Sequence, residues 1–206
     1  MFNDIDINEL GKRVRIYMSE SRYRHTLGVV AAAEHIGAII MPERLTELKI
    51  AAMLHDVAKE LPYDEQIALI DDYKVSVERE DLRIKAAVHS FAGVALVRRD
   101  FSELATENIL SAIYNHTLGD TEMSLFDEII FLADYIEDGR TYDSCVAVRD
   151  FICSNIGKDR DLYANVSVLH SAVVLSCDAT ISKLTSINAP VSTKTEKTRT
   201  AFMKRQ

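Results

Sequence analysis

The segment from Ala51 to Lys59 constrains this chain more than any other part of its sequence. Four apolar residues run directly into His55 and Asp56, and Lys59 follows three positions later. The segment contains no Gly and stops at Pro62, so it predicts a helix. Apolar residues one turn earlier share a face with both polar side chains, which predicts that the imidazole and the carboxylate point into the core.

A buried carboxylate at this position needs a partner. Leaving Asp56 unpaired would cost on the order of several kcal/mol, and a divalent cation is the natural group to neutralise it. Other expected helices offer further ligands on their apolar faces, because periodicity turns four more polar side chains inward. These are His25, His89, His116 and Asp134.

Composition indicates an all-α fold. Gly (7 residues) and Pro (3) are scarce in a chain of 206 residues. We expect residues 1–187 to form a single helical domain, and the basic segment 188–206 to be a solvated, disordered tail. Apolar spacing predicts helices over about 4–19, 21–40, 42–61, 63–73, 88–98, 103–117, 125–136, 142–156 and 160–187, with Ser21 as a cap of the second.

Charge and sequence signals limit the partners. The formal net charge of −8 argues against a general nucleic-acid binder, whose affinity would rest on a basic face. We see no signal peptide and no stretch approaching the roughly 18 apolar residues of a membrane span. The three cysteines have no metal-binding spacing. A cytoplasmic protein without a membrane partner is therefore expected.

The six inward side chains are more informative together than singly. A lone histidine on an apolar face is usually structural, which is how we interpret His35 and His170. Imidazole and carboxylate ligands suit Fe, Mn, Zn or Mg. Four histidines and two aspartates are enough for one closed site, or for two ions that share Asp56 as a bridge.

The ordered set resembles a known family. The segments that carry the resemblance are Arg24-His25-Thr26-Leu27-Gly28-Val29, Leu54-His55-Asp56-Val57-Ala58-Lys59-Glu60-Leu61-Pro62, His116-Thr117-Leu118-Gly119 and Phe131-Leu132-Ala133-Asp134-Tyr135-Ile136-Glu137-Asp138-Gly139-Arg140. In this order they resemble the bacterial symmetrical bis(5′-nucleosyl)-tetraphosphatases of the HD superfamily of metal-dependent phosphohydrolases. The resemblance spans about residues 20–185.

The resemblance implies an HD-type helical bundle, an iron-type metal centre, and hydrolysis of diadenosine tetraphosphate to two ADP. By position, the first-metal ligands would be His25, His55, Asp56 and Asp134. His89 and His116 would hold a second metal or contact the phosphates. Lys59 and Arg140 would contact the phosphates, and Thr117 would bind substrate. Our hypothesis is that hydroxide held by the metal at Asp56 attacks a central phosphorus, while Lys59 and Arg140 neutralise the charge on the departing ADP.

Two positions depart from the family pattern. Asp120 stands where the family usually has a basic residue after its His-Thr-x-Gly element, and Asp138 stands where it often has Pro. The first departure removes an expected phosphate contact. The second is expected to change only the stiffness of the loop.

Several alternatives stay open at this point. The substrate could be another nucleotide, such as a deoxynucleoside di- or triphosphate, or the chain could be a non-catalytic metal- or nucleotide-binding sensor. The ligands are compatible with Fe, Mn, Co or Ni, and with one ion or two. The sequence does not fix the oligomeric state, and a homodimer is one option.

Overall fold

Every regular element in the part of the chain that the structure describes is helical. The computed structural model describes residues 2 and 5–205, so the first residue of the helix expected over 4–19 lies outside the description, as does residue 206 of the expected tail. The helices are α1 (Ile7–Val14), α2 (Glu20–Ile40), α3 (Leu45–Leu54), α4 (Tyr63–Asp72), α5 (Val88–Asp100), α6 (Glu107–Asn115), α7 (Leu125–Ile136), α8 (Asp143–Asn155), α9 (Leu162–Ser186) and α10 (Thr193–Met203). Short 3-10 turns cover Arg15–Tyr17, Pro42–Arg44, Asp81–Arg83, Lys85–Ala87 and Ser102–Leu104. The all-α prediction is confirmed.

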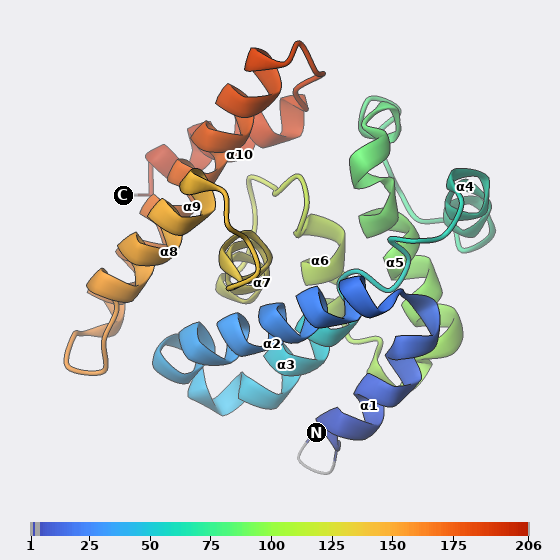
Figure 1. Cartoon of the computed structure of the whole chain (residues 1–206), viewed down its shortest axis with the longest axis horizontal. Coiled ribbons are helices and arrows are strands. Elements are labelled where there is room, and N and C mark those ends of the chain that lie inside the picture. The colour runs from blue at the N-terminus through green and yellow to red at the C-terminus, as the bar shows by residue number, and fades with distance from the viewer. Residues whose placement is uncertain (1, 3–4, 206) are drawn as a thin grey trace.

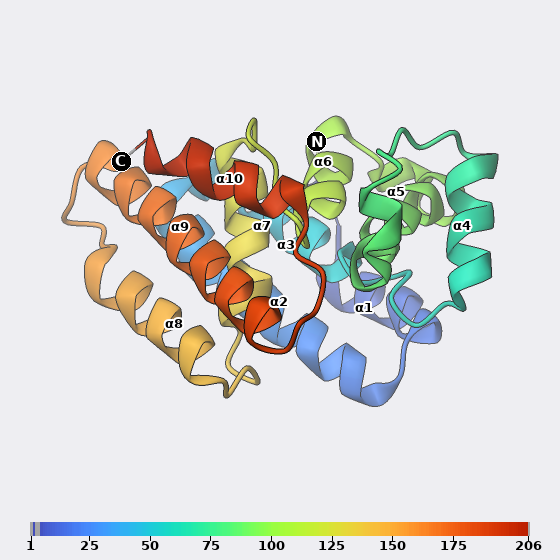
Figure 2. The same ribbon diagram turned by 90° about the horizontal axis from the view of Figure 1, so that it is seen from above.

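The bundle is organised around α3 and α7. Helices α2, α6 and α7 all pack on α3, and residues 50–58 at its end are buried without exception. Helices α8, α9 and α10 gather at one end of the molecule, whereas α4 and α5 lie at the other (Figures 1 and 2). The segment that carries His55 and Asp56 therefore lies in the middle of the core.

Side-chain caps fix where several helices begin. Ser19, rather than the expected Ser21, accepts from the Arg22 amide and caps α2. Ser124 and Asp127 form a reciprocal capping box at the start of α7. Such caps satisfy amide groups that have no partner within the helix.

The helix expected to continue to Pro62 ends earlier, at Leu54. Nδ1 of His55 lies 2.6 Å from the carbonyl oxygen of Ala52, which is the oxygen that the amide of residue 56 would use in a continuing α-helix. The chain then proceeds through turns, with Val57 bonded to Leu54 and Lys59 to Asp56. The imidazole thus competes with the helix backbone and places Asp56 in a turn.

The prediction of a disordered C-terminal tail is wrong. Residues 193–203 form α10, which packs along α9. Ser192 caps this helix, and its inner face carries Thr195, Thr198 and the fully buried Phe202. Phe202 is the one large apolar side chain that α10 buries. The sequence of this segment therefore lacks the repeated apolar residues by which a helix is predicted. The division of the chain at residue 187 stays a prediction.

The expectation that no segment approaches the apolar length of a membrane span is wrong for α9. It is long and apolar enough to cross a membrane by length and composition alone. Helix α9 packs against α7, α8 and α10. Its apolar residues are therefore explained by the packing of a core helix.

Candidate metal centre

Asp56 is the residue on which the candidate site converges. The residue is 3 % exposed, and its two carboxylate oxygens face different partners. Oδ1 lies 3.1 Å from Nε2 of His89 and 3.6 Å from Nε2 of His116. Oδ2 lies 3.4 Å from Nε2 of His55 and 3.6 Å from Nε2 of His25. The four histidines expected from the sequence thus surround one carboxyl group.

Asp134 closes the site on the α7 side. Its Oδ1 lies 3.0 Å from Nε2 of His25 and 3.9 Å from Nε2 of His55. The guanidinium of Arg140 pairs with the same oxygen at 2.7 Å. The structure therefore brings the two aspartates together through the histidines between them.

The remaining predicted residues line the His89 side. Nζ of Lys59 lies 3.2 Å from both ring nitrogens of His89 and 3.4 Å from the carbonyl oxygen of Ala86. Oγ1 of Thr117 lies 3.3 Å from Nε2 of His89. Each predicted site residue thus has a place in this cluster, while their roles toward metal and substrate stay predictions.

Two histidines are positioned by the ends of their own helices. Nδ1 of His55 faces the Ala52 carbonyl, and Nδ1 of His116 lies 2.7 Å from the Ile113 carbonyl. A carbonyl oxygen only accepts, so each Nδ1 carries the proton and each Nε2 presents a lone pair to the centre. This arrangement is typical of metal-binding imidazoles, whose second nitrogen donates to a fixed acceptor.

Burial and neighbouring charge act against each other at the carboxylates. Burial by itself raises the pKa of Asp56, but the charge of the His55 ring and the close approach of the His116 and His89 rings hold that pKa well below its usual range. Burial likewise raises the pKa of Asp134, which His25 and Arg140 bring well below the ordinary value. Both carboxyl groups are therefore anionic at neutral pH.

The pKa values of the histidine, lysine and arginine side chains at the site shift in different directions. Burial lowers the pKa of His89 to about 4, against the opposing effect of Asp56. Burial also lowers the pKa of Lys59. For His55, burial acts downward, yet the charge of Asp56 leaves its pKa above the ordinary value. For Arg140, burial is outweighed by Asp134, which raises its pKa.

The residues present fit a divalent cation. Nε2 of His25 and Nε2 of His55 are buried and have no hydrogen-bond partner among the described residues. Two sets of ligand atoms lie within 4.8 Å of one another: His25 with His55 and Asp134, and His55 with Asp56 and His116. Nitrogen and carboxylate oxygen are the donors that Fe, Mn, Co, Ni or Zn accept. A cation would satisfy the orphaned nitrogens and offset the two buried negative charges.

Two residues of the site were missed by the sequence analysis. Arg22 pairs with Oδ2 of Asp56 at 2.9 Å, and Oε1 of Glu137 lies 3.1 Å from Nδ1 of His25. Arg22 precedes His25 by three positions on α2, and Glu137, the C-cap of α7, follows Asp134 by three, so each lies about one turn from a predicted ligand. That spacing was a usable signal.

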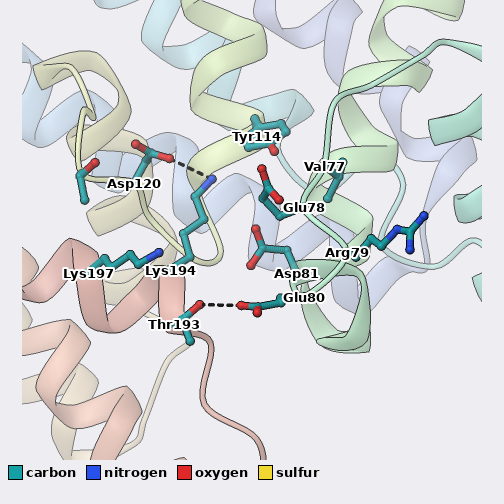
Figure 3. A pocket seen from close by; sticks show the side chains of 11 residues that line it. Val77, Glu78, Arg79, Glu80, Asp81, Tyr114, Asp120, Thr193, Lys194 and Lys197 are labelled. Atoms are coloured by element: carbon teal, nitrogen blue, oxygen red, sulfur yellow. Dashed lines mark hydrogen bonds and ion pairs between the residues drawn. The ribbon is translucent and has the colours of Figure 1, made fainter.

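A separate cavity lies at the N-terminal end of α10 (Figure 3). Its volume is about 750 Å³, and none of the predicted site residues lines it. Lys194 in its wall pairs with Asp120 at 2.9 Å and lies over the ring of Tyr114. The acidic residue at position 120 is thus neutralised from α10.

Comparisons with known proteins agree with this geometry. The sequence model of the HD domain family matches residues 22–139. The symmetrical bis(5′-nucleosyl)-tetraphosphatase of Halalkalibacterium halodurans is 33 % identical over 138 residues, which cover 66 % of this chain and 71 % of that protein. The enzyme of the same name from Bacillus subtilis is 34 % identical over 140 residues, covering 66 % and 72 %.

A solved structure shows the same fold over nearly the whole chain. It is a crystal structure from Clostridium acetobutylicum, described as a predicted HD superfamily hydrolase involved in NAD metabolism, with 28 % identity and a TM-score of 0.81. The match covers 98 % of this chain and 99 % of that one. The family match, the fold and the clustered histidines and aspartates lead to one conclusion: this chain belongs to the HD domain family, in the branch of the symmetrical bis(5′-nucleosyl)-tetraphosphatases.

Proposed function

We propose that this protein hydrolyses diadenosine tetraphosphate symmetrically, giving two ADP, at a metal centre formed by His25, His55, Asp56 and Asp134. The observation that carries the proposal is the convergence of these side chains on the buried Asp56 carboxylate. The names of the relatives at 33 % and 34 % identity support the choice of substrate. His89 and His116 face the opposite oxygen of Asp56, where they contact the phosphates or a second ion.

When bound, a divalent cation supplies Lewis acidity to the phosphates and lowers the pKa of a coordinated water toward ~7. The protein's own cations bind and orient the polyphosphate. Lys59 and Arg140 are both partly exposed beside the buried centre. Their ammonium and guanidinium groups can therefore donate hydrogen bonds to a bound ligand. Placing these charges next to the bridge offsets the negative charge that develops on the leaving ADP.

The buried histidines of the site hold protons at defined atoms. His55 and His116 keep theirs on Nδ1, directed at backbone carbonyls, so their Nε2 lone pairs stay directed at the centre. The lowered pKa of His89, about 4, keeps that ring neutral at physiological pH. The Oγ1 of Thr117 lies beside the same ring and can donate to a phosphate oxygen.

Product analysis tests the proposal. The protein, supplied with Mn²⁺ or Fe²⁺, is incubated with diadenosine tetraphosphate, and the nucleotides are separated. Two ADP per substrate are expected. AMP with ATP would exclude symmetrical cleavage, and turnover of deoxynucleotides alone would assign the site to another phosphohydrolase reaction.

Substitutions test the residue roles. Asp56→Ala is expected to abolish both metal content and turnover, because one carboxylate serves all four histidines. Asp64→Ala is the matched control, since this exposed aspartate on α4 lies outside the cluster. Lys59→Ala and Arg140→Ala are expected to lower turnover with metal content unchanged. Full activity in Asp56→Ala would refute the scheme, and metal loss in either cation variant would reassign that residue as a metal-site group.

A further inference from the structure

His25 differs from the other site histidines in the group that receives its Nδ1 proton. His55 and His116 each face a carbonyl of the helix that carries them. His25 on α2 instead faces a carboxylate, Oε1 of Glu137, which comes from the end of α7. The second nitrogen of His25 therefore meets a carboxylate, whereas those of His55 and His116 meet a neutral carbonyl dipole.

The Glu137 carboxylate is held in a fitted position. The residue is 5 % exposed, and its Oε2 accepts the amide of Gly139 at 2.6 Å. Gly28 lies one turn after His25 on α2, and a Cβ there would collide with Oε2 of Glu137. A Cβ at Gly139 would lie 2.9 Å from the same oxygen. The absence of a side chain at Gly28 and Gly139 thus leaves room for the Glu137 carboxylate where it lies.

Arg149 of α8 fixes the turn from its other side. Its Nε donates to the carbonyl of Ile136 at 2.5 Å, and its Nη2 donates to the carbonyls of Glu137 and Arg140. Carbonyls at the end of a helix lack partners within the helix, and this guanidinium bonds two of them, at Ile136 and Glu137, together with the Arg140 carbonyl in the turn that follows. The segment held in this way delivers Glu137 to His25 and Arg140 to Asp134.

We infer that Glu137 is a positioning residue for the metal centre, and that Arg149 secures it. The carboxylate keeps the proton of His25 on Nδ1 and makes its Nε2 the most electron-rich nitrogen donor of the site. A carboxylate behind an imidazole fixes the ring and raises its basicity, and removing such a partner typically weakens metal binding about 10–100-fold. The inference rests on the metal centre of the proposed function, but not on the identity of the substrate.

Metal affinity is the direct test. Glu137→Gln keeps the size of the side chain and removes its charge. Mn²⁺ is titrated into the full-length protein, and free Mn²⁺ is measured by electron paramagnetic resonance. We expect the Kd of Glu137→Gln to rise about 10–100-fold. The matched control is Glu128→Gln, which removes a buried carboxylate on the same helix that faces His170 and Arg205; its Kd should stay at the wild-type value. An unchanged Kd in Glu137→Gln would overturn the inference.

A measurement on the unmutated protein covers the case in which the variant fails to fold. The ¹⁵N shifts of the imidazoles in the Zn²⁺-bound protein report which nitrogen of His25 carries the proton and which binds the ion. A proton on Nδ1 is expected, and a proton on Nε2 with the ion on Nδ1 would overturn the inference. Arg149→Lys, which cannot reach three carbonyls at once, should raise the Mn²⁺ Kd by a smaller factor. An unchanged Kd in this variant would overturn the part assigned to Arg149.

The outcome is separable from that of the proposed function. If Glu137→Gln weakens Mn²⁺ binding while the wild-type protein forms no ADP from diadenosine tetraphosphate, the substrate assignment fails and the role of Glu137 stands. If wild-type protein forms two ADP and Glu137→Gln binds Mn²⁺ as tightly as wild type, the substrate assignment stands and the role of Glu137 fails.

Discussion

Replacing Gly119 by alanine tests whether α10 supports the loop that follows His116 and Thr117. Gly119 has a φ of +73°, and an L-residue in a left-handed conformation costs about 1–2 kcal/mol. The added Cβ would also lie 2.8 Å from Cγ2 and 2.9 Å from Oγ1 of Thr198 on α10. Crowding of this kind in a packed interior costs about 1–3 kcal/mol. Together these effects predict a loss of about 2–5 kcal/mol in the free energy of unfolding.

A double-mutant cycle separates the two contributions. Thr198→Ala removes both of the closest atoms and leaves only Cβ of residue 198, at 3.2 Å, so it should relieve most of the crowding and leave the backbone cost. Urea unfolding of the two single variants and the double variant is expected to give a favourable coupling of about 1–3 kcal/mol. Turnover should fall in Gly119→Ala and recover partly in the double variant, because Thr117 lies two residues away. A loss below about 1 kcal/mol in Gly119→Ala, or additive effects in the cycle, would refute the described contact.

Three further predictions concern stability. Phe202→Ala should lower the free energy of unfolding by about 3–5 kcal/mol, because the ring is fully buried; urea unfolding measures this. A hydrogen bond to Glu128 raises the pKa of His170 above 6.5, against burial, so the stability it contributes is complete below that value and is lost as pH rises through the folded-state pKa. The stability difference between wild type and His170→Gln should therefore be largest below pH 6.5 and shrink as the pH rises above it. Mn²⁺ at about 100 times its Kd should stabilise the wild type by about 2.7 kcal/mol, and a chelator should reverse this.

The helices were predictable because their signal is local. Each amphipathic stripe repeats within one segment, and the interior polar residues His25, His89 and Asp134 stood out against it. Their convergence also followed from physics, since inward carboxylates and imidazoles need each other or a cation. What periodicity could not show was the end of α3, because the backbone there is interrupted by the side chain of His55.

Contacts between distant segments were harder to predict. Arg149 reaches the end of α7 from the neighbouring helix α8, and nothing in its immediate sequence identifies those carbonyls as its partners. Helix α10 was missed because Phe202 is its single large buried side chain, and a segment with that composition usually remains solvated. The surface on which α10 packs is made by α9 and the loop around Gly119, which lie outside the local sequence of α10.

The division of Asp56 between its two oxygens has a consequence for how the site can change. One carboxyl group faces the His25 and His55 rings with one oxygen and the His89 and His116 rings with the other. The amide of an asparagine at this position would present an acceptor to one pair of rings and a donor to the other. Even this conservative substitution would therefore change the hydrogen bonding of one pair of histidines. A shift of any helix that positions one of these rings would therefore need a matching shift of the other helices around the same carboxyl group.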